Sequence, residues 1–285
     1  MTRLANAVTL LGAGTQGSRL AYMWSRLGKP VYLVDKSSSQ LTQASSAVHD
    51  MRERNPPERE GKLIRLDTDN MEKALRNSWL TIECIPEDLQ RKRAVIKELD
   101  TRTDPETIIA TNSSSYPISD IVKGLSLKAD DRLVNLHAFW PPETQALEIM
   151  GTEKTRPDII PLLMKETQRH GFMPFHVKKH STGYMFNRIW AAIKRETLLV
   201  LEEGIATPKE VDQICKAVLK TPLGPCEQMD IAGLDVILDI EKHYAQERSG
   251  IPEGPRRLLK EMVGQGNLGV KSGSGFFKYN NSVKT

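Results

Sequence analysis

Short apolar runs, rich in β-branched residues, alternate with longer amphipathic segments from residue 7 to about residue 177. This alternation is typical of a parallel α/β sheet. Segments in which apolar residues recur at helical spacing lie between these runs. The predicted strands are residues 7–11, 30–34, 62–66, 79–85, 107–112, 132–139, 146–150 and 174–178, and the clearest predicted helices are residues 15–28, 88–100 and 157–171.

Beyond residue 183 the pattern becomes helical. Residues 184–204 predict a long helix that ends at Gly204. Residues 207–219 predict a second helix, with Thr207 as its N-cap. No convincing strand pattern returns after this point, so the end of the chain is expected to be all-helical.

The chain has 285 residues, and 39% of them are hydrophobic, which is enough for two packed cores. We expect an α/β fold in which a dinucleotide-type, Rossmann-like domain covers residues 1–181 and an all-α domain covers residues 182–285. The formal charge of +4 is a small difference between 40 basic and 36 acidic side chains, so nucleic-acid binding is not expected. No apolar stretch is long enough to predict a membrane-spanning helix.

The three cysteines, Cys84, Cys215 and Cys226, are widely spaced and form no C-x-x-C pair. This spacing argues against a disulfide framework and against a zinc site. The N-terminal residues also lack the pattern of a secretory signal peptide. We therefore expect a reducing, cytoplasmic location and no bound metal.

Gly12, Gly14 and Gly17 form a G-x-G-x-x-G sequence between the first predicted strand and the helix that follows it. The first glycine permits a tight turn, the second lets the backbone approach a pyrophosphate, and the third lets the helix pack against the strand. The N–H groups at the start of the helix, near Thr15 and Gln16, are then available to an anion. The sequence therefore predicts a dinucleotide-binding turn.

Asp35 ends the second predicted strand, at the position where a carboxylate accepts hydrogen bonds from a ribose diol. Its charge opposes a 2′-phosphate and favours NAD over NADP. Lys36 and the serines at 37–39 leave NADP open, because they would meet a phosphate if Asp35 turned away.

Six later segments, in the right order, resemble the 3-hydroxyacyl-CoA dehydrogenase family, and with the glycine turn the resemblance covers nearly the whole chain. It implies an NAD-dependent dehydrogenase that acts on the 3-hydroxyl or 3-oxo group of an acyl chain. Residues 1–181 would be its NAD-binding domain, and residues 182–285 its substrate and dimerisation domain. The segments are Glu83 to Glu87 with Lys92, "TNSSS" at 111–115, His137 to Pro141 with Glu148, Gly183 to Arg188, "LEEGIATPKEVD" at 201–212 and "GVKSGSGFFKY" at 269–279.

The resemblance implies that His137 is the acid/base, because imidazole exchanges protons in both directions near neutral pH. The Pro141-Pro142 turn lets the chain double back, so Glu148 returns on the neighbouring strand, where it would orient the ring and stabilise its protonated form. Ser114 and Asn187 would orient the substrate or the nicotinamide. Two alternatives stay open: Ser114 caps the helix near Pro117, and Asn187 binds backbone at the domain junction.

Glu87 and Lys92 match family positions near the cofactor, although a helix surface commonly carries such residues without a ligand. Lys271, in the glycine-rich segment that closes the chain, is a further expected cofactor contact.

The chain departs from the family pattern at two places. Trp140 stands where the family has asparagine, and it either contacts the substrate or packs into the core. The segment after Asp35 is shorter than in typical members, where a helical hairpin binds coenzyme A, and it contains Pro56 and Pro57. Basic residues that would still meet the coenzyme phosphates are Arg52, Arg54, Arg59 and Lys62.

The substrate therefore stays open: an acyl group, possibly as a CoA thioester, or a free 3-hydroxy acid as in gulonate and carnitine dehydrogenases. A specialised ketone or imine reductase is another alternative, and an NAD-binding structural protein without turnover is a fourth. The resemblance also implies a homodimer, for which the apolar stripes in residues 232–244 and in the helix after Gly183 are candidate surfaces.

Overall fold

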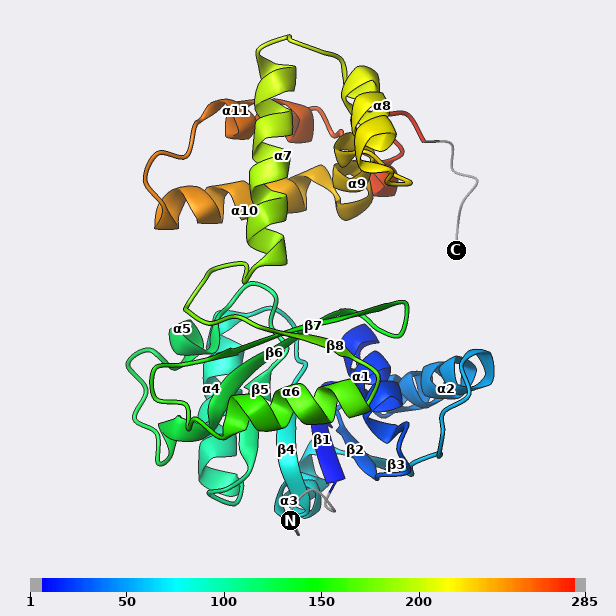
Figure 1. Ribbon diagram of the computed structural model, residues 1–285, viewed down its shortest axis with the longest axis vertical. Coiled ribbons are helices and arrows are strands. Elements are labelled where there is room, and N and C mark those ends of the chain that lie inside the picture. The colour runs from blue at the N-terminus through cyan, green and yellow to red at the C-terminus, as the bar shows by residue number, and fades with distance from the viewer. Residues whose placement is uncertain (1–6, 280–285) are drawn as a thin grey trace. The chain divides into compact units, whose positions relative to one another are not determined.

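The computed structural model describes residues 7–279, and the chain divides into two compact units, residues 1–185 and 186–285 (Figure 1). The first unit contains one eight-stranded sheet in the order β3-β2-β1-β4-β5-β6-β7-β8. All eight predicted strands are present, and their ends agree with the prediction to within two residues. The strands are β1 (Ala7–Leu11), β2 (Val31–Val34), β3 (Leu63–Leu66), β4 (Ser78–Glu83), β5 (Ile108–Thr111), β6 (Leu133–Trp140), β7 (Thr144–Gly151) and β8 (Met173–His176).

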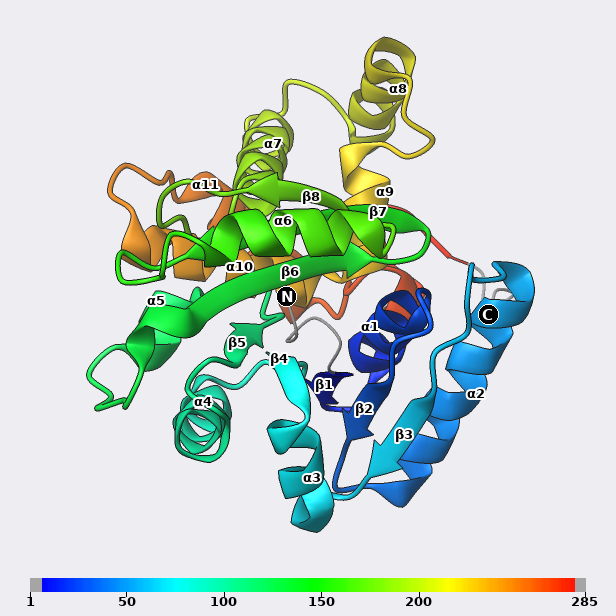
Figure 2. The same ribbon diagram turned by 60° about the horizontal axis from the view of Figure 1, so that its bottom comes forward.

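Helices cover both faces of this sheet (Figure 2). Side chains alternate along each strand, so Val8 and Leu10 enter a core beneath α1, α2 and α6, whereas Ala7 and Leu11 enter a second core beneath α3, α4 and α5. The helices of this unit are α1 (Thr15–Ser25), α2 (Ser38–Arg54), α3 (Met71–Arg76), α4 (Leu89–Arg102), α5 (Ile118–Val122) and α6 (Ile159–Arg169), with short 3₁₀ turns at Thr68–Asn70 and Asp130–Arg132.

The sheet is mostly parallel, as predicted, and the chain doubles back at β7, as the paired prolines predicted. Strands β1 to β6 are parallel, but β7 runs antiparallel to β6, and β8 runs parallel to β7. The cause is the short connection through Pro141 and Pro142, because a few residues can join antiparallel strands while parallel strands need a long crossover.

The segment after the second strand contains a single helix. Helix α2 ends at Arg54, just before Pro56 and Pro57, and β3 begins at Leu63. Proline disfavours helical backbone in the residue before it and removes a helical N–H, so the helix stops there. Only a loop joins α2 to β3, and no helical hairpin is formed in this part of the chain.

In the part of the second unit that the structure describes, every regular element is a helix. Helix α8 has Thr207 as its N-cap, as predicted, in a capping box with Glu210. The elements are α7 (Phe186–Glu202), α8 (Pro208–Leu219), α9 (Pro225–Ala232), α10 (Leu234–Glu247), α11 (Gly254–Gly264) and a 3₁₀ turn at Val270–Ser272. Among residues 7–279, no helix has the length and apolar character needed to cross a membrane.

The segment that closes the second unit is fastened to Asp230 in α9. The Asp230 carboxylate accepts hydrogen bonds from the N–H groups of Phe276 and Phe277 and from the Tyr279 hydroxyl. Gly275 is required here, because a Cβ at this position would lie 2.0 Å from Asp230 Oδ1. The glycine-rich end of the chain therefore folds back onto the core of its own unit.

Candidate active site

The glycine turn joins β1 to α1 and has the shape that a pyrophosphate requires. Gly12 has φ of 106°, and a Cβ there would lie 2.6 Å from the Cys84 carbonyl oxygen. A Cβ on Gly17 would lie 1.9 Å from the Gly12 carbonyl oxygen, so this glycine permits the close packing of helix on turn. Around Gly14, in contrast, a Cβ would meet nothing within 4 Å. The open side of the turn is thus at Gly14, where backbone can approach a phosphate.

The first turn of α1 complements an anion. Gly14 is its N-cap, no side chain caps the helix, and its first turn contains no acidic residue. The N–H groups at this end point out of the helix without intrahelical partners, and the helix dipole adds positive potential. Thr15 and Gln16 lie in this turn, as predicted.

Asp35 directly follows β2 and lies against the glycine turn. One carboxylate oxygen accepts a hydrogen bond from the Ala13 N–H (2.8 Å), and the other accepts one from the Ser37 N–H (2.9 Å). Each oxygen still has a lone pair for a further donor. These contacts fix the carboxylate in a place and orientation that suit a ribose diol.

His137 and Glu148 lie directly opposite one another on β6 and β7. His137 Nδ1 is 3.0 Å from Glu148 Oε2, and both side chains are buried. The other carboxylate oxygen, Oε1, accepts a hydrogen bond from the Met185 N–H (2.9 Å). The carboxylate contacts Nδ1, so Nε2 is the ring nitrogen outside this contact.

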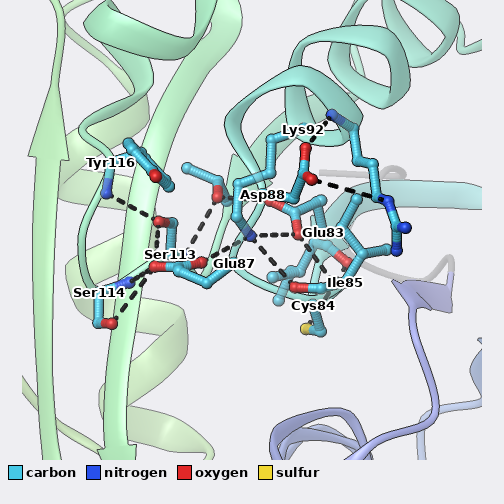
Figure 3. A network of polar contacts seen from close by, with 12 residues as sticks. Glu83, Cys84, Ile85, Glu87, Asp88, Lys92, Ser113, Ser114 and Tyr116 are labelled. Atoms are coloured by element: carbon cyan, nitrogen blue, oxygen red, sulfur yellow. Dashed lines mark hydrogen bonds and ion pairs between the residues drawn. The ribbon is translucent and has the colours of Figure 1, made fainter. Parts of the chain in front are cut away.

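Glu87 organises the serine turn that follows β5 (Figure 3). Its Oε1 accepts hydrogen bonds from the Ser113 hydroxyl (2.6 Å), the Ser114 N–H (3.0 Å) and the Ser115 N–H (2.9 Å), and the Ser114 hydroxyl lies 3.3 Å away. Burial raises the pKa of the Glu87 carboxyl, but the Lys92 ammonium and these hydrogen bonds outweigh it and lower the pKa overall. Glu87 is therefore a fixed anion beneath Ser114.

Lys92 lies on α4 beneath the same turn, and its side chain is only 1% exposed. Its Nζ is 2.8 Å from Glu83 Oε1, 3.0 Å from Glu87 Oε2 and 3.2 Å from the Ile85 carbonyl oxygen (Figure 3). Burial lowers the pKa of Lys92, but the two carboxylates outweigh it and raise the pKa overall. The structure shows that Lys92 links Glu83 to Glu87. Direct contact between Lys92 and a cofactor stays a prediction.

Gln16 and Arg19, on α1, bind the tip of the β6–β7 hairpin. Gln16 Nε2 donates to the Phe139 carbonyl oxygen (2.6 Å), and Arg19 Nη1 donates to the Pro141 carbonyl oxygen (2.6 Å). The Arg19 guanidinium also stacks over the Trp140 ring, 4.3 Å from its centroid. Trp140 is 48% exposed, so the alternative in which it packs into the core is wrong.

Asn187 and Lys271 belong to the second unit. Asn187 lies in the first turn of α7. The Lys271 ammonium is 2.5 Å and 2.6 Å from the two carboxylate oxygens of Asp235. The first unit by itself brings together the remaining predicted residues: the glycine turn, Asp35, the His137–Glu148 pair and the Glu87-bound serine turn.

The pattern along the chain gave no role to several residues that support this site. Asn112 Oδ1 accepts a hydrogen bond from the Ala138 N–H and so fixes the strand next to His137. Tyr184 packs its ring on the His137 imidazole. Thr111 donates to Glu83, which is fully buried. The only available signal was the place of Glu83 and Asn112 at the ends of adjacent predicted strands, where functional groups gather in parallel sheets.

A Rossmann-like sheet with this glycine turn and with Asp35 after its second strand defines a dinucleotide-binding protein. Comparison with known proteins identifies the group more closely. Residues 7–180 match the model for the NAD-binding domain of 3-hydroxyacyl-CoA dehydrogenase, and residues 183–279 match the model for its C-terminal domain. The chain belongs to the 3-hydroxyacyl-CoA dehydrogenase family.

Individual relatives agree with this assignment. A probable 3-hydroxyacyl-CoA dehydrogenase of Caenorhabditis elegans is 30% identical over 290 residues, which cover 96% of this chain and 93% of the relative. The structure of (S)-3-hydroxybutyryl-CoA dehydrogenase from Ralstonia eutropha superposes with a TM-score of 0.83 at 27% identity, covering 97% of this chain and 99% of the other. A diketoreductase that acts on dicarbonyl compounds superposes with a TM-score of 0.79, also at 27% identity, over 96% and 99% of the two chains.

Proposed function

We propose that His137 and Glu148 form the acid/base dyad of this dehydrogenase. Bound NAD would accept the hydride from the carbon that carries the hydroxyl. His137 Nε2 takes the hydroxyl proton as the substrate is oxidised, and it returns the proton in the reverse direction. The observation that carries this proposal is the buried contact of 3.0 Å between Nδ1 and Glu148, which leaves Nε2 for the substrate.

Glu148 acts on the orientation and charge of the ring. Its carboxylate selects the tautomer with a proton on Nδ1 and stabilises the imidazolium that forms when Nε2 accepts a proton. The Met185 N–H holds the second carboxylate oxygen, so the carboxylate is itself fixed. Ser114, placed by Glu87, and Asn187 of the second unit orient the reacting groups.

The proposed substrate is a 3-hydroxyacyl-CoA thioester, as the names of the C. elegans and R. eutropha relatives suggest. A cavity of about 270 Å³ next to the glycine turn, lined in part by Gly14, Arg19 and Arg54, supports a place for an anionic carrier. Arg52 is engaged elsewhere, by Glu60 and by the Gly61 carbonyl oxygen. Of the four basic residues considered for CoA, Arg54 alone lines this cavity, so we assign it to this role.

A second candidate is reduction of a dicarbonyl compound without CoA, which the likeness to the diketoreductase favours. Both candidate reactions use the same dyad and the same cofactor. They differ in whether the substrate is a CoA thioester. Purified protein would be assayed for NADH formation with 3-hydroxybutyryl-CoA and with free 3-hydroxybutyrate, and for NADH consumption with a diketone. Turnover of the thioester alone supports the proposal, and turnover of the diketone alone supports the second candidate.

The dyad has its own test. His137→Ala should lower kcat about 10²- to 10⁴-fold, which is the usual contribution of general acid–base catalysis. His176, exposed at the end of β8, is the matched control, and His176→Ala should leave kcat unchanged. Equal activity of the His137→Ala variant and the parent would overturn the dyad.

We also propose a homodimer in a reducing compartment such as the cytoplasm. Phe186, Ile189 and Ile193 recur at helical spacing on α7, and each is more than 40% exposed. Such a stripe is suited to a second copy of the chain. The three cysteines are free, as a reducing compartment requires. Sedimentation as a monomer at micromolar concentration would contradict the dimer.

A further inference from the structure

Tyr184 lies at the end of the first unit in an uncommon backbone conformation. Gly183 has φ of 74° and Tyr184 has φ of 53°, so two successive residues are left-handed. A non-glycine residue rarely adopts this region, and such conformations persist where the surroundings determine them and often where function requires them. The Ser181 side chain donates to the Tyr184 carbonyl oxygen (2.7 Å) and helps to hold the turn.

The turn places the Tyr184 ring on the face of the proposed acid/base. The centroids of the Tyr184 and His137 rings are 4.8 Å apart, and the two planes differ by only 12°. The Phe139 ring is 4.7 Å from the same imidazole at a tilt of 53°. Aromatic contacts therefore restrain the His137 ring in addition to the Glu148 contact at Nδ1.

The next residue acts on the other half of the dyad, because the Met185 N–H donates to Glu148 Oε1. Two consecutive residues thus restrain both members of the pair, Tyr184 through its ring and Met185 through its backbone.

The Tyr184 hydroxyl serves a different part of the site. It donates to the Ser113 carbonyl oxygen (2.5 Å) and accepts a hydrogen bond from Asn135 Nδ2 (2.8 Å). Burial, together with the charges of Glu87 and Glu148, raises the pKa of this hydroxyl well above its ordinary value, so it stays protonated and keeps its role as a donor. It therefore ties the carbonyl group that precedes Ser114 to strand β6.

We propose that Tyr184 is a positioning residue that serves two groups at once: its ring holds the His137 imidazole, and its hydroxyl holds the serine turn that carries Ser114. The inference rests on the proposed function, in which His137 exchanges the proton and Ser114 orients the substrate. Loss of the ring contact and loss of the hydroxyl contact should have different kinetic consequences. A misplaced imidazole slows the chemical step and lowers kcat, whereas a loosened serine turn weakens binding of the acyl substrate and raises KM.

Two substitutions separate the role of the Tyr184 ring from the role of its hydroxyl. Tyr184→Phe keeps the ring and removes the hydroxyl, so KM for 3-hydroxybutyryl-CoA, or for the diketone if that is the substrate turned over, should rise about three- to tenfold while kcat stays within about twofold. Tyr184→Leu removes the ring as well, so kcat should also fall about tenfold or more. If Tyr184→Leu does not fold, Tyr184→Met, which is also without a ring, takes its place.

Tyr22→Phe is the matched control. Tyr22 is also fully buried, and its hydroxyl also donates to a backbone carbonyl oxygen, that of Asn55 (2.7 Å). Its removal should lower stability as Tyr184→Phe does but should leave kcat and KM as in the parent. An unchanged KM in Tyr184→Phe would overturn the proposed role of the hydroxyl. An unchanged kcat in the ringless variant would overturn the proposed role of the ring.

The geometry is tested without catalysis by NMR of protein labelled at histidine. A stacked ring shifts the His137 carbon-bound proton resonances upfield, and a His137→Ala sample identifies them. The shift should be equal in the parent and in Tyr184→Phe and should be clearly smaller in Tyr184→Leu, where only the Phe139 ring remains beside the imidazole. No shift in the parent would overturn the stacking itself, whereas a normal shift together with full turnover by His137→Ala would overturn only the proposed function.

Discussion

The Lys92 ammonium nitrogen lies 2.8 Å from Glu83 Oε1, and the two side chains are 1% and 0% exposed. The Thr111 hydroxyl donates to the second oxygen of Glu83 (2.6 Å), and the Glu87 carboxylate is a second partner for Lys92. The pair thus links the end of β4 and helix α4 to the serine turn. Removal of the cation would leave two carboxylates beside each other with no compensating charge.

Lys92→Met should lower the free energy of unfolding by about 3–5 kcal/mol, because one partner of a buried ion pair is left without compensation. Urea denaturation at neutral pH measures this difference. Lys97→Met is the matched control: Lys97 lies on the same helix but is exposed, and its loss should change the free energy of unfolding by less than about 0.5 kcal/mol. Equal changes in the free energy of unfolding for the two substitutions would show that the buried ion pair stabilises the fold no more than an exposed lysine does.

Much of the fold is predictable because strands in a covered sheet are continuous apolar runs, and all eight stand out in the sequence. The apolar pattern does not report the direction of a strand, but the paired prolines at 141 and 142 predicted the reversal at β7. The short helix α3 was missed, because six residues hold too few periods to show helical spacing, whereas α5 lies where a helix near Pro117 was expected.

The site was predictable where one segment contains the whole feature. The glycine turn carries its own spacing, and the resemblance to known segments marked His137 and Glu148. The ion pair of Glu83 with Lys92, and the stacking of Tyr184 on His137, depend on which strands become neighbours, and spacing along the chain does not report that. For the same reason, the docking of Gln16 against the β6–β7 hairpin became visible only in the structure.

Asp35→Ala should weaken NAD binding about tenfold or more and should weaken NADP binding much less. Loss of a charged hydrogen-bond acceptor costs about 1.5–3 kcal/mol, and this loss applies to the ribose diol of NAD, whereas a 2′-phosphate is relieved of repulsion. Titration calorimetry with both nucleotides measures the ratio. Asp35→Asn, which keeps the shape and one acceptor oxygen, should fall between the parent and Asp35→Ala. Equal losses for NAD and NADP would argue against the ribose contact.

Alanine substitutions at two glycines of the same turn should affect different properties. Gly17→Ala should lower stability, and Gly14→Ala should lower NAD affinity. Gly17→Ala should lower the melting temperature, because its Cβ meets the Gly12 carbonyl oxygen at 1.9 Å and the helix must move. Gly14→Ala should fold almost as well as the parent, since its Cβ meets nothing within 4 Å.

Gly14→Ala should nevertheless lose NAD affinity, because the methyl group occupies the space through which backbone approaches the pyrophosphate. Thermal melts with and without NAD give both quantities for each variant. Normal stabilisation of Gly14→Ala by NAD would place the pyrophosphate elsewhere.

His170 should make the protein sensitive to acid. Its side chain is 6% exposed and packs 4.7 Å from the Trp24 ring, and burial lowers its pKa from 6.5 to about 4, although the Met23 carbonyl oxygen accepts a hydrogen bond from the ring. A histidine with a lowered pKa in the folded state contributes its full stability above pH 6.5 and loses that contribution as the pH falls toward 4. The loss amounts to about 2 kcal/mol at pH 5.

His170→Gln removes the titrating group and keeps an N–H donor. The parent should therefore lose about 2 kcal/mol more unfolding free energy than this variant between pH 7 and pH 5. His49→Gln, at an exposed position of α2, is the control and should lose as much unfolding free energy as the parent between the two pH values. Urea denaturation of the three proteins at each pH decides the matter: parallel losses in the parent and in His170→Gln would mean that the buried imidazole does not set the acid sensitivity.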